Sequence, residues 1–265
     1  MSYKKSLTID EQIEYLAKDK RVVYNMMSKE DAKDVLSRYG YINVITPFKF
    51  HFAKTDKNGN EIRDSENKHI YERDVDFKEY YDCYQNERSK YTTIYEKIRD
   101  FEITFNSVVG REVLLFYQID DETAFVDFCS KLTDNVNNVS TDKETVKDKM
   151  RETISKFPDE ITKYDSAFIF MDRLSFNETI TIFKNVDQGL QNKIFNNLIS
   201  LDGTLGYLKL KSFLQMLPKL VLVRNCVYHN NSLTILKRYY KIKEKVLRDR
   251  RSYQSYGSLI NKLSS

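Results

Sequence analysis

The stretch Leu220-Val-Leu-Val-Arg-Asn-Cys-Val-Tyr-His-Asn-Asn-Ser-Leu233 is apolar up to Arg224, and then carries Arg224, Asn225 and His229 in close succession. On a helix that turns about 100° per residue, four apolar side chains would share one side: Leu217, Leu220, Val223 and Val227. Asn225 and His229 are four residues apart, so they would lie together on the opposite side. The spacing predicts a helix that buries one side and presents an amide and an imidazole on the other.

Arg224 is the unusual residue of this helix, because it falls at the edge of the apolar stripe and buried guanidinium groups are rare unless paired. An imidazole can move a proton near neutral pH, and a guanidinium carries a fork of donors that suits a phosphate. The amide of Asn225 can orient the imidazole or the substrate. These residue types favour phosphodiester chemistry without a metal. A core helix with one paired arginine and one surface histidine would show the same spacing.

A second helical pattern, over residues 77–117, supplies a matching acid. Its apolar and aromatic side chains recur every three or four residues: Tyr91, Tyr95, Ile98, Phe101, Phe105 and Val109. Glu102 lies inside this stripe, and Asn106 follows it by one turn. Since an unpaired buried charge is costly, we expect Glu102 and Arg224 to meet.

The stretch 223–233 is similar to the signature of the Abi-like (abortive infection) family of the HEPN superfamily. Nucleases of that superfamily carry an arginine, often followed by asparagine, and a histidine a few residues later. The matching positions are Arg224, Asn225, His229, Asn231 and Leu233. The chain departs from the family at Ser232, where an arginine is usual.

The resemblance extends over most of the chain. Residues 7–13 resemble the opening helix of the family, and a tyrosine-rich stretch leads into the aromatic segment that ends at Phe52. Residues 167–183 resemble an aromatic stretch that leads through a turn into a helix, with Asn177 where glycine is usual. The family also has a glutamate in the helix comparable to that of Glu102. The resemblance implies an all-α fold, a HEPN-type helical bundle with an N-terminal helical extension.

We expect four segments along the chain: a helical extension over 1–53, a polar loop over 54–76, a HEPN-like helical domain over 77–236 and a basic helix or tail over 237–265. Only 7 Gly and 3 Pro occur in 265 residues, which favours long helices. Asn58 and Gly59 give the polar loop a turn signal. His51 and His69 flank this loop, and we expect both at the surface.

Residues 237–251 hold eight Lys or Arg against two acids. This basic segment also contains Tyr239 and Tyr240, so it suits backbone phosphates and stacked bases. The RNA-binding residues that we expect are Lys237, Arg238, Lys241, Lys245 and Arg248. A solvated helix in a lysine-rich protein would have the same composition.

The three cysteines, Cys83, Cys129 and Cys226, are odd in number and far apart, without disulfide or metal-ligand spacing. We therefore expect a cytoplasmic protein. No run approaches the roughly 20 apolar residues of a membrane span, and no phosphate-binding glycine loop occurs. We expect no metal, no cofactor and no membrane partner.

The resemblance implies a metal-independent endoribonuclease that acts in anti-phage abortive infection or as a toxin, restrained by an antitoxin, a bound RNA or an infection signal. The RNA 2′-hydroxyl would attack the adjacent phosphorus, with His229 as general base or acid, Arg224 on the phosphate and Asn225 orienting the histidine. Glu102, Asn106 and Asn231 would support this site. The motif has a single histidine, and one histidine cannot easily serve as acid and base together. We therefore expect a homodimer, in which each chain supplies its own motif.

Two alternatives use the same residues. The protein could be a non-catalytic RNA-binding protein, a ribonucleoprotein with a partner RNA, in which loss of His229 would leave its effect intact. It could also be a toxin silenced by nucleotide transfer onto a tyrosine after the histidine. Asn230 occupies that position, which counts against the second alternative.

Overall fold

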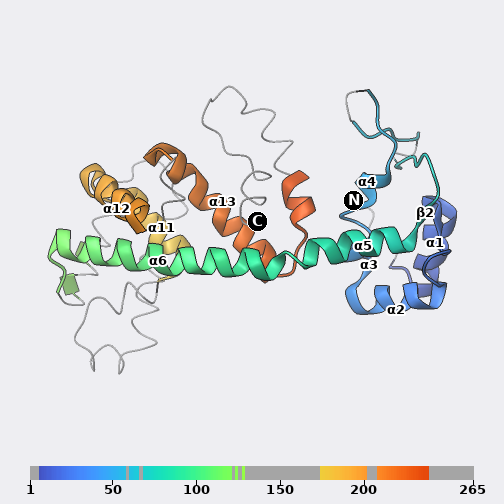
Figure 1. Ribbon diagram of the computed structural model, residues 1–265, viewed down its shortest axis with the longest axis horizontal. Helices are drawn as coiled ribbons and strands as arrows, with labels where there is room; N and C mark the ends of the chain where they lie inside the picture. Colours follow the sequence, from blue (N-terminus) through green and yellow to red (C-terminus); the bar gives the residue numbers. More distant parts are fainter. Residues whose placement is uncertain are drawn as a thin grey trace. The chain divides into compact units, whose positions relative to one another are not determined.

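The computed structural model describes residues 6–57, 60–65, 68–120, 123–124, 127–128, 174–201 and 208–238. These residues are mostly helical and include one sheet of two short strands, which confirms the predicted helical class (Figure 1). The chain forms two compact units. Unit 1 takes the described residues up to Ile94 together with 226–238, and unit 2 takes those from Tyr95 to Asn225. The division falls inside α6 and α13.

Unit 1 is built from short helices around one parallel strand pair. Its elements are α1 (Ile9–Lys20), β1 (Val22–Val23), α2 (Lys29–Tyr39), α3 (Tyr41–Val44), α4 (Lys49–Phe52), β2 (Val75–Asp76) and α5 (Phe77–Arg88). Both α1 and α2 begin at a side-chain N-cap. Thr8 forms a capping box with Glu11, and the Ser28 side chain accepts a hydrogen bond from the backbone of Asp31.

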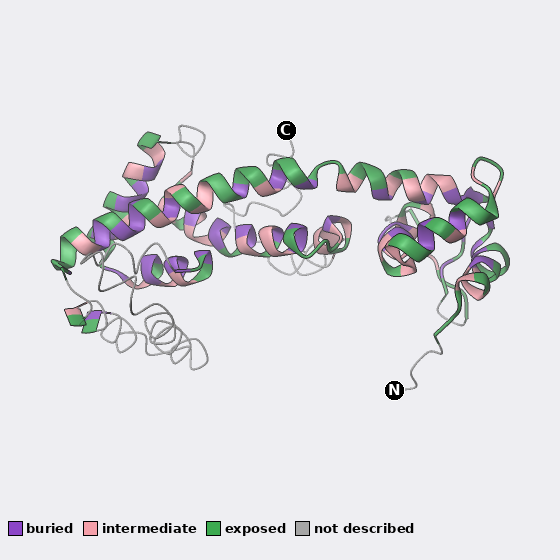
Figure 2. Ribbon diagram, turned by 90° about the horizontal axis from the view of Figure 1, so that it is seen from below, coloured by how far each residue is buried: buried purple, intermediate pink, exposed green. Residues whose placement is uncertain are grey.

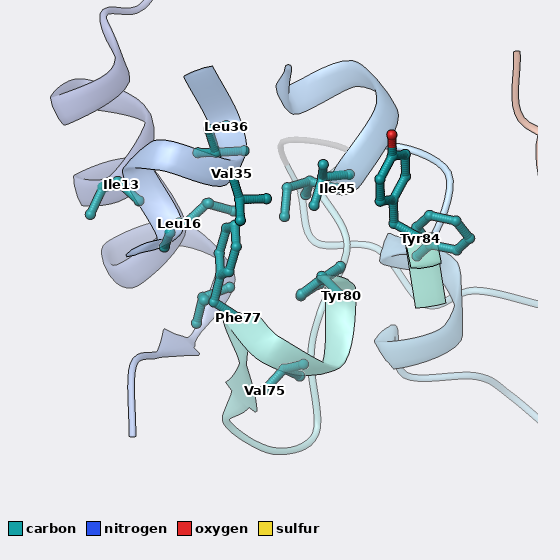
Figure 3. Close-up of a cluster of buried hydrophobic side chains, with 13 residues drawn as sticks. Ile13, Leu16, Val35, Leu36, Ile45, Val75, Phe77, Tyr80 and Tyr84 are labelled. Carbon is teal, nitrogen blue, oxygen red and sulfur yellow. The ribbon is translucent and has the colours of Figure 1, made fainter. Parts of the chain in front are cut away.

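The core of unit 1 gathers aliphatic side chains and tyrosines from these elements. Figure 3 shows Leu16 of α1 and Leu36 of α2 on one side, and Tyr80 of α5 on the other. Phe77 and Tyr80 have no exposed surface. Helix α5 contributes Phe77, Tyr80 and Tyr84 to this core from one face.

The polar segment between α4 and β2 forms isolated antiparallel bridges, such as Ala53 with Tyr71. The prediction of a surface histidine at residue 69 is wrong. His69 is only 8% exposed, because the ring of Phe50 meets it edge-on and the Glu61 carboxylate lies 3.4 Å from Nδ1. Desolvation by burial lowers the pKa of His69 to about 4. His51 is exposed, as expected.

Unit 2 contains most of α6 (Tyr91–Tyr117) with α11 (Phe176–Asn185), α12 (Gln188–Leu201) and α13 (Leu210–Tyr228) (Figure 1). Its core is a cluster of phenylalanine rings, with Phe105 of α6 and Phe213 of α13 at 6.2 Å between centroids. The other members are Phe101, Phe176, Phe183 and Phe195. Figure 2 shows buried and exposed residues alternating along α6, as expected for an amphipathic helix.

The helical pattern expected over 77–117 is divided between two helices, because α5 ends at Arg88 and α6 begins at Tyr91. Pro218 lies inside one continuous α13. Asn177, where the resemblance implies a glycine, lies in the first turn of α11, which Ser175 caps together with Glu178. Residues 123–124 and 127–128 are helical, whereas the basic residues beyond Arg238 lie outside the described residues.

Candidate functional site

Helix α13 carries the arginine and the asparagine of the motif. Its predicted apolar stripe is confirmed, since each member is less than 9% exposed: Leu217, Leu220, Val223 and Val227. Arg224 and Asn225 are half-buried next to this stripe. The stripe fixes the rotation of α13, and this rotation places Arg224 at the border between core and solvent.

The predicted pair between Arg224 and Glu102 is confirmed. The two side chains meet side-on, with Nε 3.4 Å from Oε2 and Nη2 3.4 Å from Oε1. The pair is not fully buried, since the Arg224 side chain is 36% exposed and the Glu102 side chain 16%. Both residues belong to unit 2, so the charge of the arginine is balanced inside the unit that holds it.

The two asparagines near this pair have different partners. Asn225 accepts a hydrogen bond from Nη1 of Arg224 through Oδ1, at 3.3 Å, so it contacts the arginine of the motif. Asn106 donates from Nδ2 to the backbone oxygen of Leu174, at 3.4 Å. Asn106 therefore links α6 to the residue that precedes the N-cap of α11, a structural contact that the sequence did not indicate.

His229 directly follows α13 and ends it. Asn230 has a left-handed backbone, with φ of 62°, and its N–H donates to the Val227 oxygen at 3.1 Å. The N–H of Asn231 donates to the Cys226 oxygen at 2.8 Å. These two bonds form a Schellman motif in which His229 is the C-cap. The imidazole is exposed and meets the Tyr228 ring edge-on, at 5.1 Å between centroids.

The residues after the histidine form a second short helix. Ser232 accepts a hydrogen bond from the N–H of Ile235 at 3.3 Å, and residues 233–238 are helical. Serine is a preferred N-cap, and Ser232 begins this helix at the position where the family resemblance implies an arginine. Among the described residues, Asn231 makes its contacts through its backbone.

Sequence reasoning missed two residues that hold this segment, Glu87 and Tyr91. The Tyr91 hydroxyl donates to the Asn231 oxygen at 2.5 Å, and Glu87 accepts from the N–H and the hydroxyl of Thr234 at 2.7 and 2.6 Å. Tyr91 counted as a core side chain in the apolar stripe of its helix. Its partner is a backbone oxygen 140 residues later, and the sequence gives no signal for such a contact.

Two of the expected RNA-binding residues are described. The guanidinium of Arg238 pairs with Glu61 and lies 3.4 Å from the centroid of the Phe50 ring. Lys237 is half-buried, and this burial lowers its pKa. Arg238 is thus engaged within unit 1, whereas Lys241, Lys245 and Arg248 lie outside the described part of the chain.

Within the described ranges, no group of three or more His, Cys, Asp or Glu side chains is arranged to hold a metal ion. In the same ranges, no helix has the length and apolar composition needed to cross a membrane.

The model of the Abi-like protein family matches residues 34–234. This match includes parts of both units, begins after α1 and β1, and contains Glu87, Tyr91, Glu102 and the Arg224–His229 motif. The chain therefore belongs to the Abi-like protein family. No curated protein and no solved structure matches it.

Proposed function

We propose that this protein is a metal-independent endoribonuclease of HEPN type that acts in abortive infection or as a toxin. Membership of the Abi-like family suggests the biological role. The observation that supports the chemistry is the pairing of Arg224 with Glu102 and Asn225 in unit 2. His229, which directly follows the same helix in the sequence, is exposed. The motif thus combines a guanidinium that Glu102 and Asn225 hold in place with an imidazole that is accessible to solvent.

In the proposed reaction, the 2′-hydroxyl of RNA attacks the adjacent phosphorus. His229 takes the hydroxyl proton or gives one to the leaving 5′-oxygen, because an imidazole can do either near neutral pH. Arg224 stabilises the charge that develops on the phosphate oxygens, and Asn225 holds the guanidinium in place. The products are a 2′,3′-cyclic phosphate and a 5′-hydroxyl. The expected homodimer would supply a second histidine, so that one acts as base and the other as acid.

The test is incubation of the purified protein with a labelled mixed-sequence RNA in EDTA, beside the same RNA with a single 2′-deoxy residue at the cut site. We expect cleavage of the first RNA, cyclic-phosphate ends, and no cut at the deoxy position, because the attacking group is the 2′-hydroxyl. Cleavage that requires Mg²⁺ would overturn the proposal. RNA binding without cleavage would instead favour the non-catalytic RNA-binding function.

A further inference from the structure

The backbone oxygen of Asn231 is the centre of a small polar cluster in unit 1. It accepts from the Tyr91 hydroxyl at 2.5 Å and from the Cys226 thiol at 3.2 Å, so two donors hold it from two directions. Tyr91 and Cys226 are 8% and 7% exposed. Burial raises the pKa of the Cys226 thiol to about 12, so the sulfur keeps its proton as a donor.

Glu87 fixes the next part of the same segment. Its Oε2 accepts from both the N–H and the hydroxyl of Thr234, in the first turn of the 233–238 helix. A carboxylate at a helix start satisfies N–H groups that have no partner within the helix and complements the helix dipole. The other oxygen of Glu87 lies 3.2 Å from the Tyr91 hydroxyl. One acid and one tyrosine therefore hold Asn231 and Thr234 together.

These contacts lie on both sides of the turn that carries His229. Before the histidine, the Schellman bonds to Val227 and Cys226 close the end of α13. After it, Tyr91 and Glu87 attach Asn231 and Thr234 to the corner where α5 ends and α6 begins. Within the described residues, the exposed ring of His229 meets the ring of its neighbour Tyr228 edge-on. The position of the imidazole therefore depends on the backbone of residues 230–234, which these hydrogen bonds hold.

We propose that Tyr91 and Glu87 are positioning residues for His229, since they fix the backbone that follows it to the α5–α6 corner. This inference rests on the proposed function, in which the imidazole moves a proton to or from an RNA oxygen. Proton transfer needs the donor and acceptor within hydrogen-bond reach, and a misplacement of about 1 Å can cost on the order of 100-fold in rate. Neither residue touches RNA in this proposal.

The test compares Tyr91→Phe and Glu87→Gln with wild type in RNA cleavage. Both variants keep the size of the side chain, and each removes one part of the anchor: the hydroxyl that donates to Asn231, or the charge that faces Thr234. We expect kcat to fall about 10-fold or more, with KM for RNA unchanged. The matched control is Tyr84→Phe, a buried tyrosine of α5 that packs against Tyr39, and its kcat should equal that of wild type.

Two readouts separate positioning from a general loss of structure. In a His229→Ala background, Tyr91→Phe should lower the remaining rate no further, because the group that it positions is absent. Amide hydrogen exchange at Asn231 and Thr234 should become faster in Tyr91→Phe and Glu87→Gln, but not in Tyr84→Phe. Wild-type kcat in both variants, or an equal loss in the His229→Ala background, would overturn the inference.

The exchange measurement does not depend on catalysis. If wild-type protein cleaves no RNA, the proposed function is wrong. Hydrogen exchange alone then tests whether the contacts of Tyr91 and Glu87 anchor Asn231 and Thr234. Unchanged protection of Asn231 and Thr234 in both variants would overturn the anchor as well. Faster exchange there would support it as the device that holds His229 for whatever ligand the motif binds.

Discussion

Arg224 and Glu102 are 122 residues apart in sequence, and their side chains meet side-on at 3.4 Å in unit 2. Each lies at the border of an apolar stripe on its own helix, α13 or α6. The pair therefore joins these two helices at the level of the motif, while the phenylalanine cluster joins them deeper in the unit. The arginine that we propose to bind phosphate is also part of the packing of this unit.

The first prediction concerns the stability that this pair contributes. Glu102→Ala should lower the free energy of unfolding by about 1–3 kcal/mol, because it leaves a half-buried guanidinium without its carboxylate. The value is smaller than for a fully buried pair, since the arginine side chain is 36% exposed. Urea denaturation followed by circular dichroism measures it, because the chain has no tryptophan to report fluorescence. Glu96→Ala, an exposed acid on the same helix, is the control and should change stability little.

The sequence could predict this pair because both residues break the pattern of their own helix. The same reasoning could not predict Tyr91, whose hydroxyl bonds a backbone oxygen while its ring fits the apolar stripe. Backbone atoms are identical at every residue, so such contacts leave no trace in side-chain periodicity. Helix starts at Thr8 and Ser28 were predictable because the capping atoms lie within three residues of their partners.

The second prediction concerns the pH dependence of unit 1. The pKa of His69 is lowered by burial from its ordinary value of 6.5 to about 4, so the unfolded chain binds a proton that the folded protein rejects. The resulting stability is complete above about pH 6.5 and falls as the pH drops toward 4, by up to about 3 kcal/mol. His69→Gln cannot titrate, so its unfolding free energy should depend less on pH in this range. Parallel curves for the two proteins between pH 7 and pH 4 would contradict the prediction.

His69 also shows why the polar segment was only partly predictable. Its neighbours in sequence are hydrophilic, which indicates a solvent-exposed loop. In the structure, Phe50 and Glu61 cover the imidazole, and Arg238 packs on the same phenylalanine and pairs with the same acid. These contacts come from segments far apart in the chain, so the hydropathy of the loop does not predict them.

The third prediction separates Arg238 from the rest of the basic segment. Changing Lys241, Lys245 and Arg248 to alanine should flatten the salt dependence of binding to single-stranded RNA by about 0.7 log units per lost phosphate contact. Arg238→Ala should leave the slope nearly unchanged and should lower stability instead, because its guanidinium is held by Glu61 and Phe50. Binding titrations at several salt concentrations measure the slopes. A slope reduced as much by Arg238→Ala as by any other single change would show that Arg238 contacts RNA.

The last prediction separates the structural and the chemical roles of the motif. His229→Ala should lower the cleavage rate by about 100-fold or more and leave the unfolding curve unchanged, because the imidazole is exposed and its loss opens no cavity. Arg224→Lys keeps the charge beside Glu102 but loses the planar fork, so we expect a large loss of rate with a loss of stability smaller than that of Arg224→Ala. His51→Ala, at an exposed histidine of unit 1, should leave the rate unchanged. If Arg224→Lys cleaves RNA at the wild-type rate while His229→Ala does not, the guanidinium serves packing alone, and another group must stabilise the phosphate.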